Sequence, residues 1–345
     1  MQIFCKNRVN LQFPRSELLL DPRILGKGTD HCVFISHAHT DHLPSSRKKP
    51  ATLSPIVCSK ATARLFQNRK GYEITTQTSW SNDEFKIEAI TSGHTFDSTA
   101  ASITNLATQE KIIYTGDINT ESRGYLEGYK PSKCDILILE ATYGSKKYQF
   151  PSFEEQIKLA RDYISEQLAQ GYPVALLGYA LGKAQLLNYC LGDLADIRFS
   201  QKTIWEMEQI HRELGLDLYE TQQISKEQAE MPVFQREPGL LFFTHFGGKN
   251  SFLSQLKKKY NLKVVGFSGW LLNQRNYTYR RSIDAGFAIS DHADFAKLLE
   301  IVRKSSPTKI FTIYGSPEKL AFELRKEGFN AIPLKKCQMT MDAFF

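Results

Sequence analysis

Residues 34–43 read FISHAHTDHL and concentrate metal-ligand side chains in a way that few folds can accommodate. Three of the chain's eight histidines and one aspartate fall here, as His37, His39, Asp41 and His42. The preceding residues CVFIS are apolar and β-branched, which predicts that the motif lies at the end of a buried strand. Side chains alternate along an extended strand, so His37 and His39 project to the same side. Asp41 and His42 then lie on the departing loop.

Imidazole and carboxylate at this spacing suit a zinc-type ion, which needs three or four protein ligands. Other candidates follow other apolar strands: His94 after FKIEAIT, Asp117 after KIIYTG and His292 after GFAIS. Each stands just past a strand beside a small residue, where one edge of a sheet could gather them. Four candidates in one motif plus these three indicate two adjacent ions. His211, on a predicted helix face, is instead expected at the surface.

Composition limits the class of protein. The 345 residues are 41% hydrophobic and 23% charged, as in soluble globular proteins of one large or two ordinary domains. No apolar run reaches the length of a membrane span, and the N-terminus lacks a signal pattern, so we expect a cytoplasmic protein. The six cysteines form no CxxC pair and are expected to be buried, reduced thiols. Nitrogen and oxygen must then hold any metal.

Apolar periodicity predicts an α/β chain in which strands and helices alternate. The first half reads as short strands, such as 85–91 and 135–141, with a helix at 61–70. The later part alternates buried strands with helices, such as those predicted at 153–170 and 252–260. Composition alone marks no domain boundary.

The net charge of +7 is unevenly distributed. Residues 151–237 hold 8 basic and 14 acidic side chains, whereas residues 238–283 hold no acidic one. This acid-free stretch interleaves basic residues with aromatic ones, which favours a surface that faces a polyanion such as a phosphodiester strand. The alternative is a solvated helix face over core aromatics. For the lysines at 257–259 alone, that alternative is at least as good.

The motifs together resemble a known family. HAHTDH followed by GH and then GD resembles the metallo-β-lactamase superfamily. The pattern continues with LEATYG, YALGKAQ, SGW and SDHAD, and resembles the β-CASP nucleases, especially the DNA-ligase-associated exonucleases. The resemblance runs from about Leu18 to about Gly328. HxHxDH is specific for the superfamily, and LGKAQ and SDHAD are specific for β-CASP proteins.

The resemblance implies two divalent ions, zinc or alternatively manganese. His37, His39 and His94 would bind one ion, Asp41, His42 and His292 the other, and Asp117 would bridge both. Asp21 matches the family's first motif, an aspartate that supports the site without necessarily binding metal. Glu140 matches the acidic motif that pairs with and orients the late histidine, as a carboxylate behind a ligand imidazole commonly does.

The resemblance also implies a fold: a metallo-β-lactamase αββα sandwich with an inserted β-CASP α/β cap domain. The sandwich would comprise residues 1–150 and 289–345, and the cap residues 151–288. The acid-free stretch would then belong to the cap and face the metal site.

Five side chains are candidates for contact with substrate: Lys183, Trp270, Arg280, Arg281 and Tyr314. Lys183 is equally well read as a solvent-facing lysine at a helix start, and Trp270 as a core residue. Tyr314 stands where many RNA-processing relatives carry a histidine and DNA-repair relatives an apolar residue. The absence of that histidine therefore favours a DNA substrate over an RNA substrate. The Tyr314 hydroxyl could protonate the leaving group or position a phosphate.

The preferred reading is a two-metal 5′-to-3′ DNA exonuclease of a repair pathway, with a DNA ligase or helicase partner implied by resemblance only. The alternatives are an RNA-processing ribonuclease of the same fold, exo- or endonucleolytic, and more distantly a small-molecule metallohydrolase. A scaffold with a decayed site is disfavoured, because no expected ligand is missing.

Overall fold

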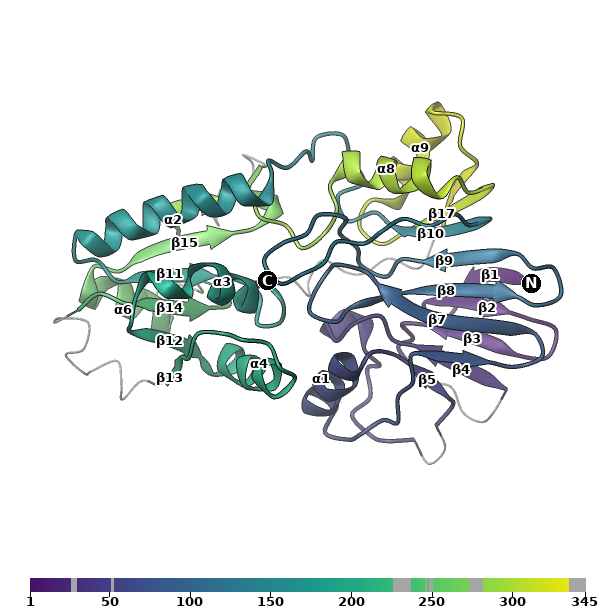
Figure 1. Ribbon diagram of the computed structural model, residues 1–345, viewed down its shortest axis with the longest axis horizontal. Helices are drawn as coiled ribbons and strands as arrows, with labels where there is room; N and C mark the ends of the chain where they lie inside the picture. The colour runs from purple at the N-terminus through teal and green to yellow at the C-terminus, as the bar shows by residue number, and fades with distance from the viewer. Residues whose placement is uncertain are drawn as a thin grey trace. The chain divides into compact units, whose positions relative to one another are not determined.

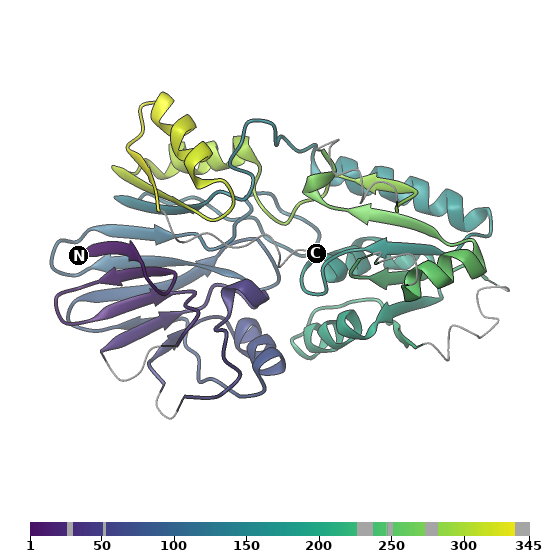
Figure 2. The same cartoon turned by 180° about the vertical axis from the view of Figure 1, so that it is seen from behind.

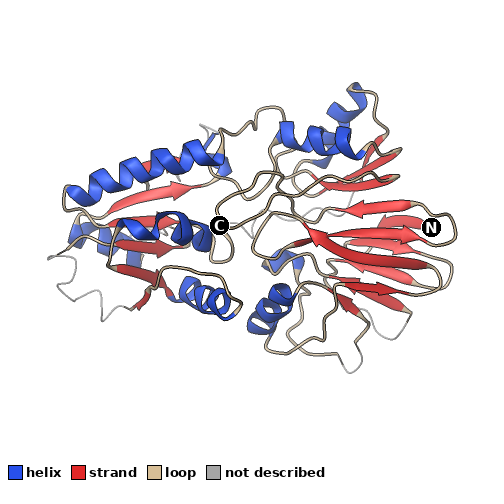
Figure 3. Cartoon of the chain, in the orientation of Figure 1, coloured by secondary structure: helices blue, strands red, loops and turns tan. Residues whose placement is uncertain are grey.

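The computed structural model describes residues 1–25, 30–50, 53–225, 237–245, 247, 251–272 and 282–334 (Figure 1). Its contacts divide the chain into two compact units. Unit 1 contains Met1–Ser122, Leu126–Gln149 and His292–Phe345, and unit 2 contains Arg123–Tyr125 and Phe150–Asp291. The resemblance placed the division after residue 150 and before residue 289. Both units mix helices and strands, which confirms the α/β class (Figure 3).

Unit 1 contains two sheets. The five-stranded sheet has the order β1 (Gln2–Cys5), β2 (Val9–Gln12), β3 (Glu17–Leu20), β4 (His31–Phe34) and β5 (Ile56–Val57). The seven-stranded sheet has the order β18 (Ala331–Pro333), β17 (Lys309–Ile313), β10 (Ile136–Glu140), β9 (Lys111–Tyr114), β8 (Thr99–Asn105), β7 (Phe85–Thr91) and β6 (Ser79–Ser81). Strands β9, β10 and β17 are parallel neighbours, so their carboxyl ends lie at the same edge.

One apolar core joins the two sheets. Leu20 and Phe34 of the first sheet and Ile138 of the second belong to the same buried cluster. Since side chains alternate along a strand, Leu137 and Leu139 point to the opposite face of β10. There they pack with helices α8 (Phe295–Ser305) and α9 (Pro317–Lys326), which cover that face (Figures 1 and 2). In the described part of unit 1, the remaining helices are α1 (Lys60–Lys70) and the 3-10 turn η1 (Thr40–His42).

Unit 2 is built on one parallel sheet. Its strands have the order β13 (Gln222–Ile224), β12 (Arg198–Gln201), β14 (Leu240–Phe243), β11 (Val174–Leu177), β15 (Lys263–Phe267) and β16 (Ala285–Phe287). Every residue of β11 and β14 is buried, as expected where helices cover both faces. Within the described residues of unit 2, the helices are α2 (Phe153–Ala169), α3 (Lys183–Leu191), α4 (Lys202–Glu213) and α6 (Phe252–Tyr260), with the 3-10 turns η2 (Gly192–Leu194) and η4 (Gly269–Leu272).

Helix α8 begins close to a candidate ligand, and its start is fixed by local chemistry. Asp294 is the N-cap, and its carboxylate accepts a hydrogen bond from the backbone N–H of Lys297 at 2.9 Å. The loop that carries His292 therefore ends at a defined helix start two residues later.

Long periodic segments were predicted well and short strands poorly. Strand β7 and helix α6 have the predicted bounds. The hairpin of β1 and β2 and the short strands β6, β12, β13 and β18 were missed, and β16 overlaps only the start of the predicted strand GFAIS. Strands of three or four residues with mixed polarity carry too little alternation to stand out from loops. Within the described residues, no helix is both long enough and apolar enough to cross a bilayer.

Two expectations about individual side chains are wrong. Cys5 is disulfide-bonded, whereas Cys32, Cys58 and Cys134 are buried free thiols, as expected. His211 is fully buried, with its Nδ1 2.7 Å from the Met207 carbonyl oxygen. This hydrogen bond reaches back one helical turn and satisfies one ring nitrogen. It therefore lowers the free-energy cost of burying His211 on α4.

Candidate metal centre

Four side chains from three strand ends of unit 1 meet in one group. His37 and His39 follow β4, His94 follows β7 and Asp117 follows β9, and one ligand atom from each lies within 4.8 Å of all the others. His39 Nδ1 is 2.9 Å from His37 Nε2 and 3.1 Å from His94 Nε2. Asp117 Oδ2 is 3.5 Å from His37 Nε2 and 3.6 Å from His94 Nε2.

These separations fit a tetrahedral zinc-type ion. Ligand atoms at bond lengths of about 2.0–2.1 Å around a tetrahedral centre lie about 3.3 Å apart. The four distances above lie on either side of that value. Burial lowers the pKa of His37 well below its ordinary range, and the neighbouring imidazoles act in the same direction. His37 is therefore a neutral imidazole, which is the form that binds metal.

A second group shares Asp117 with the first and adds Glu140 and His292. Glu140 Oε1 accepts hydrogen bonds from His292 Nδ1 and from the Ile118 backbone N–H, both at 2.9 Å. Glu140 Oε2 accepts one from the Thr142 backbone N–H at 3.1 Å. Because both carboxylate oxygens are engaged, Glu140 is better suited to orient His292 than to bind metal itself. A proton fixed on Nδ1 leaves the lone pair of His292 on Nε2.

His42 belongs to neither group but contacts Asp117, which belongs to both. Its Nδ1 is 2.7 Å from Asp21 Oδ2, and its Nε2 is 3.3 Å from Asp117 Oδ2. Apart from this approach to Asp117, Nε2 is buried and has no hydrogen-bond partner among the described residues. Buried ring nitrogens are normally satisfied, so an orphaned nitrogen that faces a shared carboxylate fits a metal ligand.

Electrostatics keep Asp117 in the form that a bridging ligand requires. Burial alone would raise the pKa of Asp117, but nearby His42 and His292 outweigh it and bring the pKa well below its ordinary value. Burial would likewise lower the pKa of His42, while Asp117 and Asp21 raise it well above its ordinary value. Asp117 therefore remains a carboxylate. A metal ion would replace the proton on the Nε2 of His42.

Asp21 is the centre of a buried hydrogen-bond network beneath His42. Its Oδ1 accepts from the Ser36 backbone N–H at 2.7 Å. Its Oδ2 accepts from Ser36 Oγ at 2.6 Å and from Tyr114 Oη at 2.7 Å, in addition to His42. A carboxylate held by four donors places the Nδ1 proton of His42 and turns Nε2 toward Asp117. This arrangement is the basis for assigning Asp21 a supporting role.

Asp41 stands apart from both groups of described residues that could hold an ion. It is half-buried in η1, and its backbone carbonyl accepts from Arg8 Nη2. Burial lowers the pKa of Arg69 while Asp41 raises it, which places the Asp41 carboxylate near that guanidinium. Its assignment as a metal ligand stays a prediction that rests on resemblance.

Tyr314 lies in the Asp21 network and is 1% exposed. Its hydroxyl is 2.7 Å from Tyr114 Oη, and its ring lies 5.4 Å from the His42 ring. Burial raises the pKa of Tyr314, so the hydroxyl keeps its proton and can donate to Tyr114. This placement gives no support to the prediction that Tyr314 contacts a substrate phosphate or protonates the leaving group.

Tyr314→Phe is expected to cost about 1 kcal/mol of unfolding free energy, the net value of one hydrogen bond, and to reduce nuclease activity less than about tenfold. Urea denaturation and initial rates would measure both, with Tyr219→Phe at the surface as the matched control. A general acid contributes about a hundredfold to ten-thousandfold. A rate loss of that size without a loss of stability would indicate that Tyr314 takes part in the reaction.

The predicted substrate contacts of unit 2 differ in outcome. Lys183 is 1% exposed with its Nζ 2.8 Å from Asp291 Oδ1, so its reading as a solvent-facing lysine is wrong. Its Nζ faces a carboxylate and not the solvent, which gives no support to contact with a phosphate either. Trp270, in η4, is half-buried. Arg280 and Arg281 lie outside the described residues.

The acid-free stretch is partly core. Phe267 is 2% exposed, and Phe252 packs against the core cluster of unit 2. Lys257 Nζ lies 2.7 Å from Asp284 Oδ2, so a carboxylate just beyond the stretch neutralises one of its charges. The polyanion-facing interpretation now rests on Lys258, Lys259, the half-buried Lys263 and residues outside the described part of the chain.

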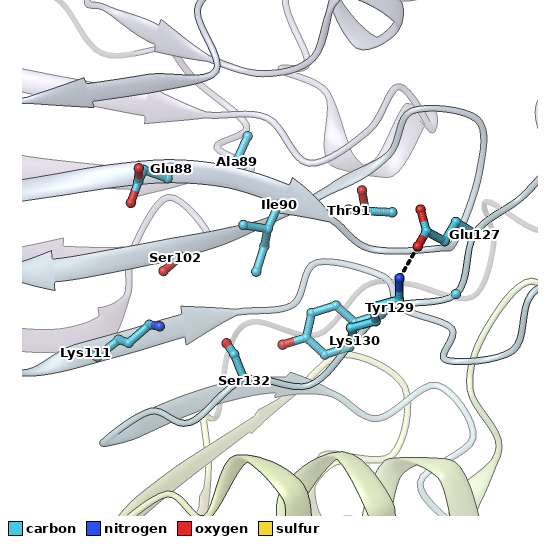
Figure 4. A pocket seen from close by; sticks show the side chains of 11 residues that line it. Glu88, Ala89, Ile90, Thr91, Ser102, Lys111, Glu127, Tyr129, Lys130 and Ser132 are labelled. Atoms are coloured by element: carbon cyan, nitrogen blue, oxygen red, sulfur yellow. Dashed lines mark hydrogen bonds and ion pairs between the residues drawn. The ribbon is translucent and has the colours of Figure 1, made fainter.

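A surface hollow of about 520 Å³ lies elsewhere on unit 1 (Figure 4). Its lining includes Glu88, Ile90, Lys111 and Tyr129, and an ion pair of Lys130 with Glu127 stands at its rim. The metal-group histidines and Asp117 are not among its lining residues. The hollow and the metal group are therefore separate features.

Comparison with known proteins places these features in context. No family model matches the chain. A protein of Opitutus terrae named "Probable DNA ligase" is 27% identical over 306 residues, covering 86% of this chain and 28% of its own length. The "RNase J-like protein" of Methanocaldococcus jannaschii is 31% identical over 191 residues, covering 48% and 44%. The human "DNA cross-link repair 1A protein" is 22% identical over 301 residues, covering 80% and 27%.

The chain thus spans less than half the length of each of these relatives. Among solved structures, a protein of unknown function from Enterococcus faecalis superposes with a TM-score of 0.63 at 14% identity, covering 100% of this chain and 97% of that one. That likeness shows a shared fold across both units.

Proposed function

The chain belongs to the β-CASP nucleases of the metallo-β-lactamase superfamily, and on that premise we propose that it hydrolyses phosphodiester bonds of nucleic acid with divalent metal ions. The observation that carries the proposal is the gathering of His37, His39, His94 and Asp117 from three strand ends into one group. Asp117 also belongs to a second group with His292, as a ligand shared by two ions would.

We assign unit 1 as the metallo-β-lactamase αββα sandwich and unit 2 as the β-CASP cap. Two sheets that share one core, with α8 and α9 on the outer face of one of them, support the first assignment. The second is supported by the position of unit 2 in the chain, as an almost continuous insertion between Gln149 and His292.

We assign the first ion to His37, His39 and His94, and the second to His42 and His292, with Asp117 shared. Asp41 is a further ligand of the second ion by resemblance. The nitrogen-rich donor set favours zinc, and manganese is the alternative. When bound, such ions polarise the phosphoryl group and lower the pKa of a bound water to near neutrality.

The chain's own residues prepare the site for this chemistry. Asp21 and Glu140 hold the Nδ1 protons of His42 and His292, so both imidazoles present Nε2. The lowered pKa of Asp117, to which His42 and His292 contribute against burial, suits it as a ligand rather than as a general base. Burial of the group removes competing water, which strengthens every charge interaction in it.

For the substrate, we propose DNA, cut from the 5′ end in a repair pathway. Of the three relatives described above, the two whose names mention DNA align with 86% and 80% of this chain, whereas the RNase J-like relative aligns with 48%. An RNA-processing ribonuclease is the alternative, since metal-assisted hydrolysis does not itself read the 2′-OH. A DNA-ligase partner is a further proposal, supported by the match to the protein named "Probable DNA ligase".

Matched DNA and RNA strands, with a 5′-phosphate or a 5′-hydroxyl and a label at either end, test this proposal. We expect DNA to be degraded faster than RNA, with the 5′ label released first as a mononucleotide. The Asp117→Asn variant, purified in parallel, serves as the control for contaminating nucleases. Faster RNA cleavage, or internal cuts, would contradict the DNA exonuclease assignment.

A further inference from the structure

Two buried cations of unit 2 converge on one carboxylate. Asp291 Oδ1 lies 2.8 Å from Lys183 Nζ and accepts a hydrogen bond from Arg123 Nη1 at 3.1 Å. The side chains of Lys183 and Arg123 are 1% exposed and that of Asp291 is 5% exposed. We call these three residues the Asp291 cluster. It is separate from the metal groups and has no part in the chemistry proposed above.

The Asp291 cluster holds the backbone directly before a proposed metal ligand. Lys183 Nζ donates to the Ile289 carbonyl at 2.9 Å, and Arg123 Nη1 donates to the Ser290 carbonyl at 2.8 Å. Three consecutive residues, 289 to 291, are therefore bound by the two cations, and the next residue is His292. On the far side of His292, the Ala293 N–H donates to the Ile118 carbonyl at 2.7 Å. His292 thus sits on a short segment that is held on both sides.

Lys183 is itself fixed in place. It is the first residue of α3, after Gly182 with a φ of 92°, a conformation that favours glycine. The Gly182 N–H donates to Gln185 Oε1 at 2.8 Å, and Gln185 Nε2 donates to the Ala180 carbonyl at 3.0 Å. A Cβ at Gly178 would come within 2.8 Å of Lys183 Cγ, so the stem of the lysine packs closely against the space that the glycine leaves open.

Buried charges are a poor way to gain stability alone, because desolvation offsets most of their attraction. Apolar side chains of similar volume would pack as well. Charged donors do add direction, since each hydrogen bond fixes an acceptor in space. In the Asp291 cluster, the three acceptors named above lie on residues 289–291.

We propose that Lys183 and Arg123 are positioning residues for His292, and that they thereby set the affinity of the second metal ion. The inference rests on the proposed function, because it takes His292 as a ligand. On this proposal, Lys183 of the YALGKAQ motif acts on the metal centre through Asp291 and does not contact substrate.

The test compares Lys183→Met, Lys183→Arg and Asp291→Asn with the unaltered protein. The matched control is Lys202→Met, because Lys202 is also the first residue of a helix in unit 2 but is 69% exposed. Metal per chain after dialysis, and zinc titration of the metal-free protein, provide readouts independent of nuclease activity. We expect two ions in the unaltered protein and in Lys202→Met. Lys183→Met and Asp291→Asn should bind the second ion at least tenfold more weakly, and Lys183→Arg should recover part of the loss.

Each other outcome has a defined meaning. Two ions bound with unchanged affinity in a folded Lys183→Met protein would overturn the inference. A higher KM for DNA alone would also overturn it and make Lys183 a substrate contact. If Lys183→Met and Asp291→Asn both fail to fold, the cluster serves the stability of unit 2 and the inference is wrong. Fewer than two ions in the unaltered protein would instead refute the two-metal proposal itself.

Discussion

The Asp117→Asn variant is expected to lose nuclease activity by about a thousandfold or more while it remains folded. Asp117 Oδ2 lies 3.3 to 3.6 Å from ring nitrogens of His37, His42 and His94. Asparagine has nearly the same shape but lacks the charge that would bridge two cations. Metal ions supply several kcal/mol of transition-state stabilisation, and about 4 kcal/mol corresponds to a thousandfold in rate. Initial rates and metal content per chain would be measured together.

Asp83→Asn is the matched control for this variant, because the Asp83 side chain is 90% exposed. It should retain full activity and metal content. If Asp117→Asn kept both ions and more than a tenth of the activity, Asp117 could not be the shared ligand. The assignment of His37, His39 and His94 to a common ion would then need another fourth ligand.

Removal of metal by a chelator is expected to abolish activity and to lower the melting temperature of unit 1 selectively. Binding at a free-ion concentration a thousandfold above Kd stabilises the folded state by about 4 kcal/mol. For a unit of this size, each kcal/mol shifts Tm by about 2–4 °C, so the expected loss is about 8–16 °C. Unit 2 contributes none of the proposed ligands. Its transition, if resolved by calorimetry, is the internal control.

Zinc and manganese would then be added back separately. The ion that restores both the melting temperature and activity at the lower concentration is the better candidate for the native metal. If chelation left activity and the unit 1 transition unchanged, and metal analysis found no transition metal, a scaffold without catalytic function would become the better reading. That result would also remove the basis for the two-metal mechanism.

The candidate ligands could be picked out from the sequence because their signal is local. A buried strand that ends in a run of histidines is visible in CVFISHAHTDH, and the same strand-end context marks His94, Asp117 and His292. The structure adds that His42 Nε2 faces Asp117 with no other partner among the described residues, whereas Asp41 lies outside both groups. Spacing could not separate those two neighbours, because which way each side chain points depends on the 3-10 turn η1 that contains both.

The sequence by itself determined the α/β class, the long elements and the set of strand ends that carry the candidate ligands. Each follows from periodicity or composition within a few residues. Only the tertiary structure decided the partners of buried polar groups. Lys183 meets Ile289 and Asp291 more than a hundred residues away, and Tyr314 meets Tyr114 at a separation of 200 residues. Such pairs depend on strand order and register, which local patterns do not encode. Burial then requires each polar group to find a partner wherever the fold supplies one.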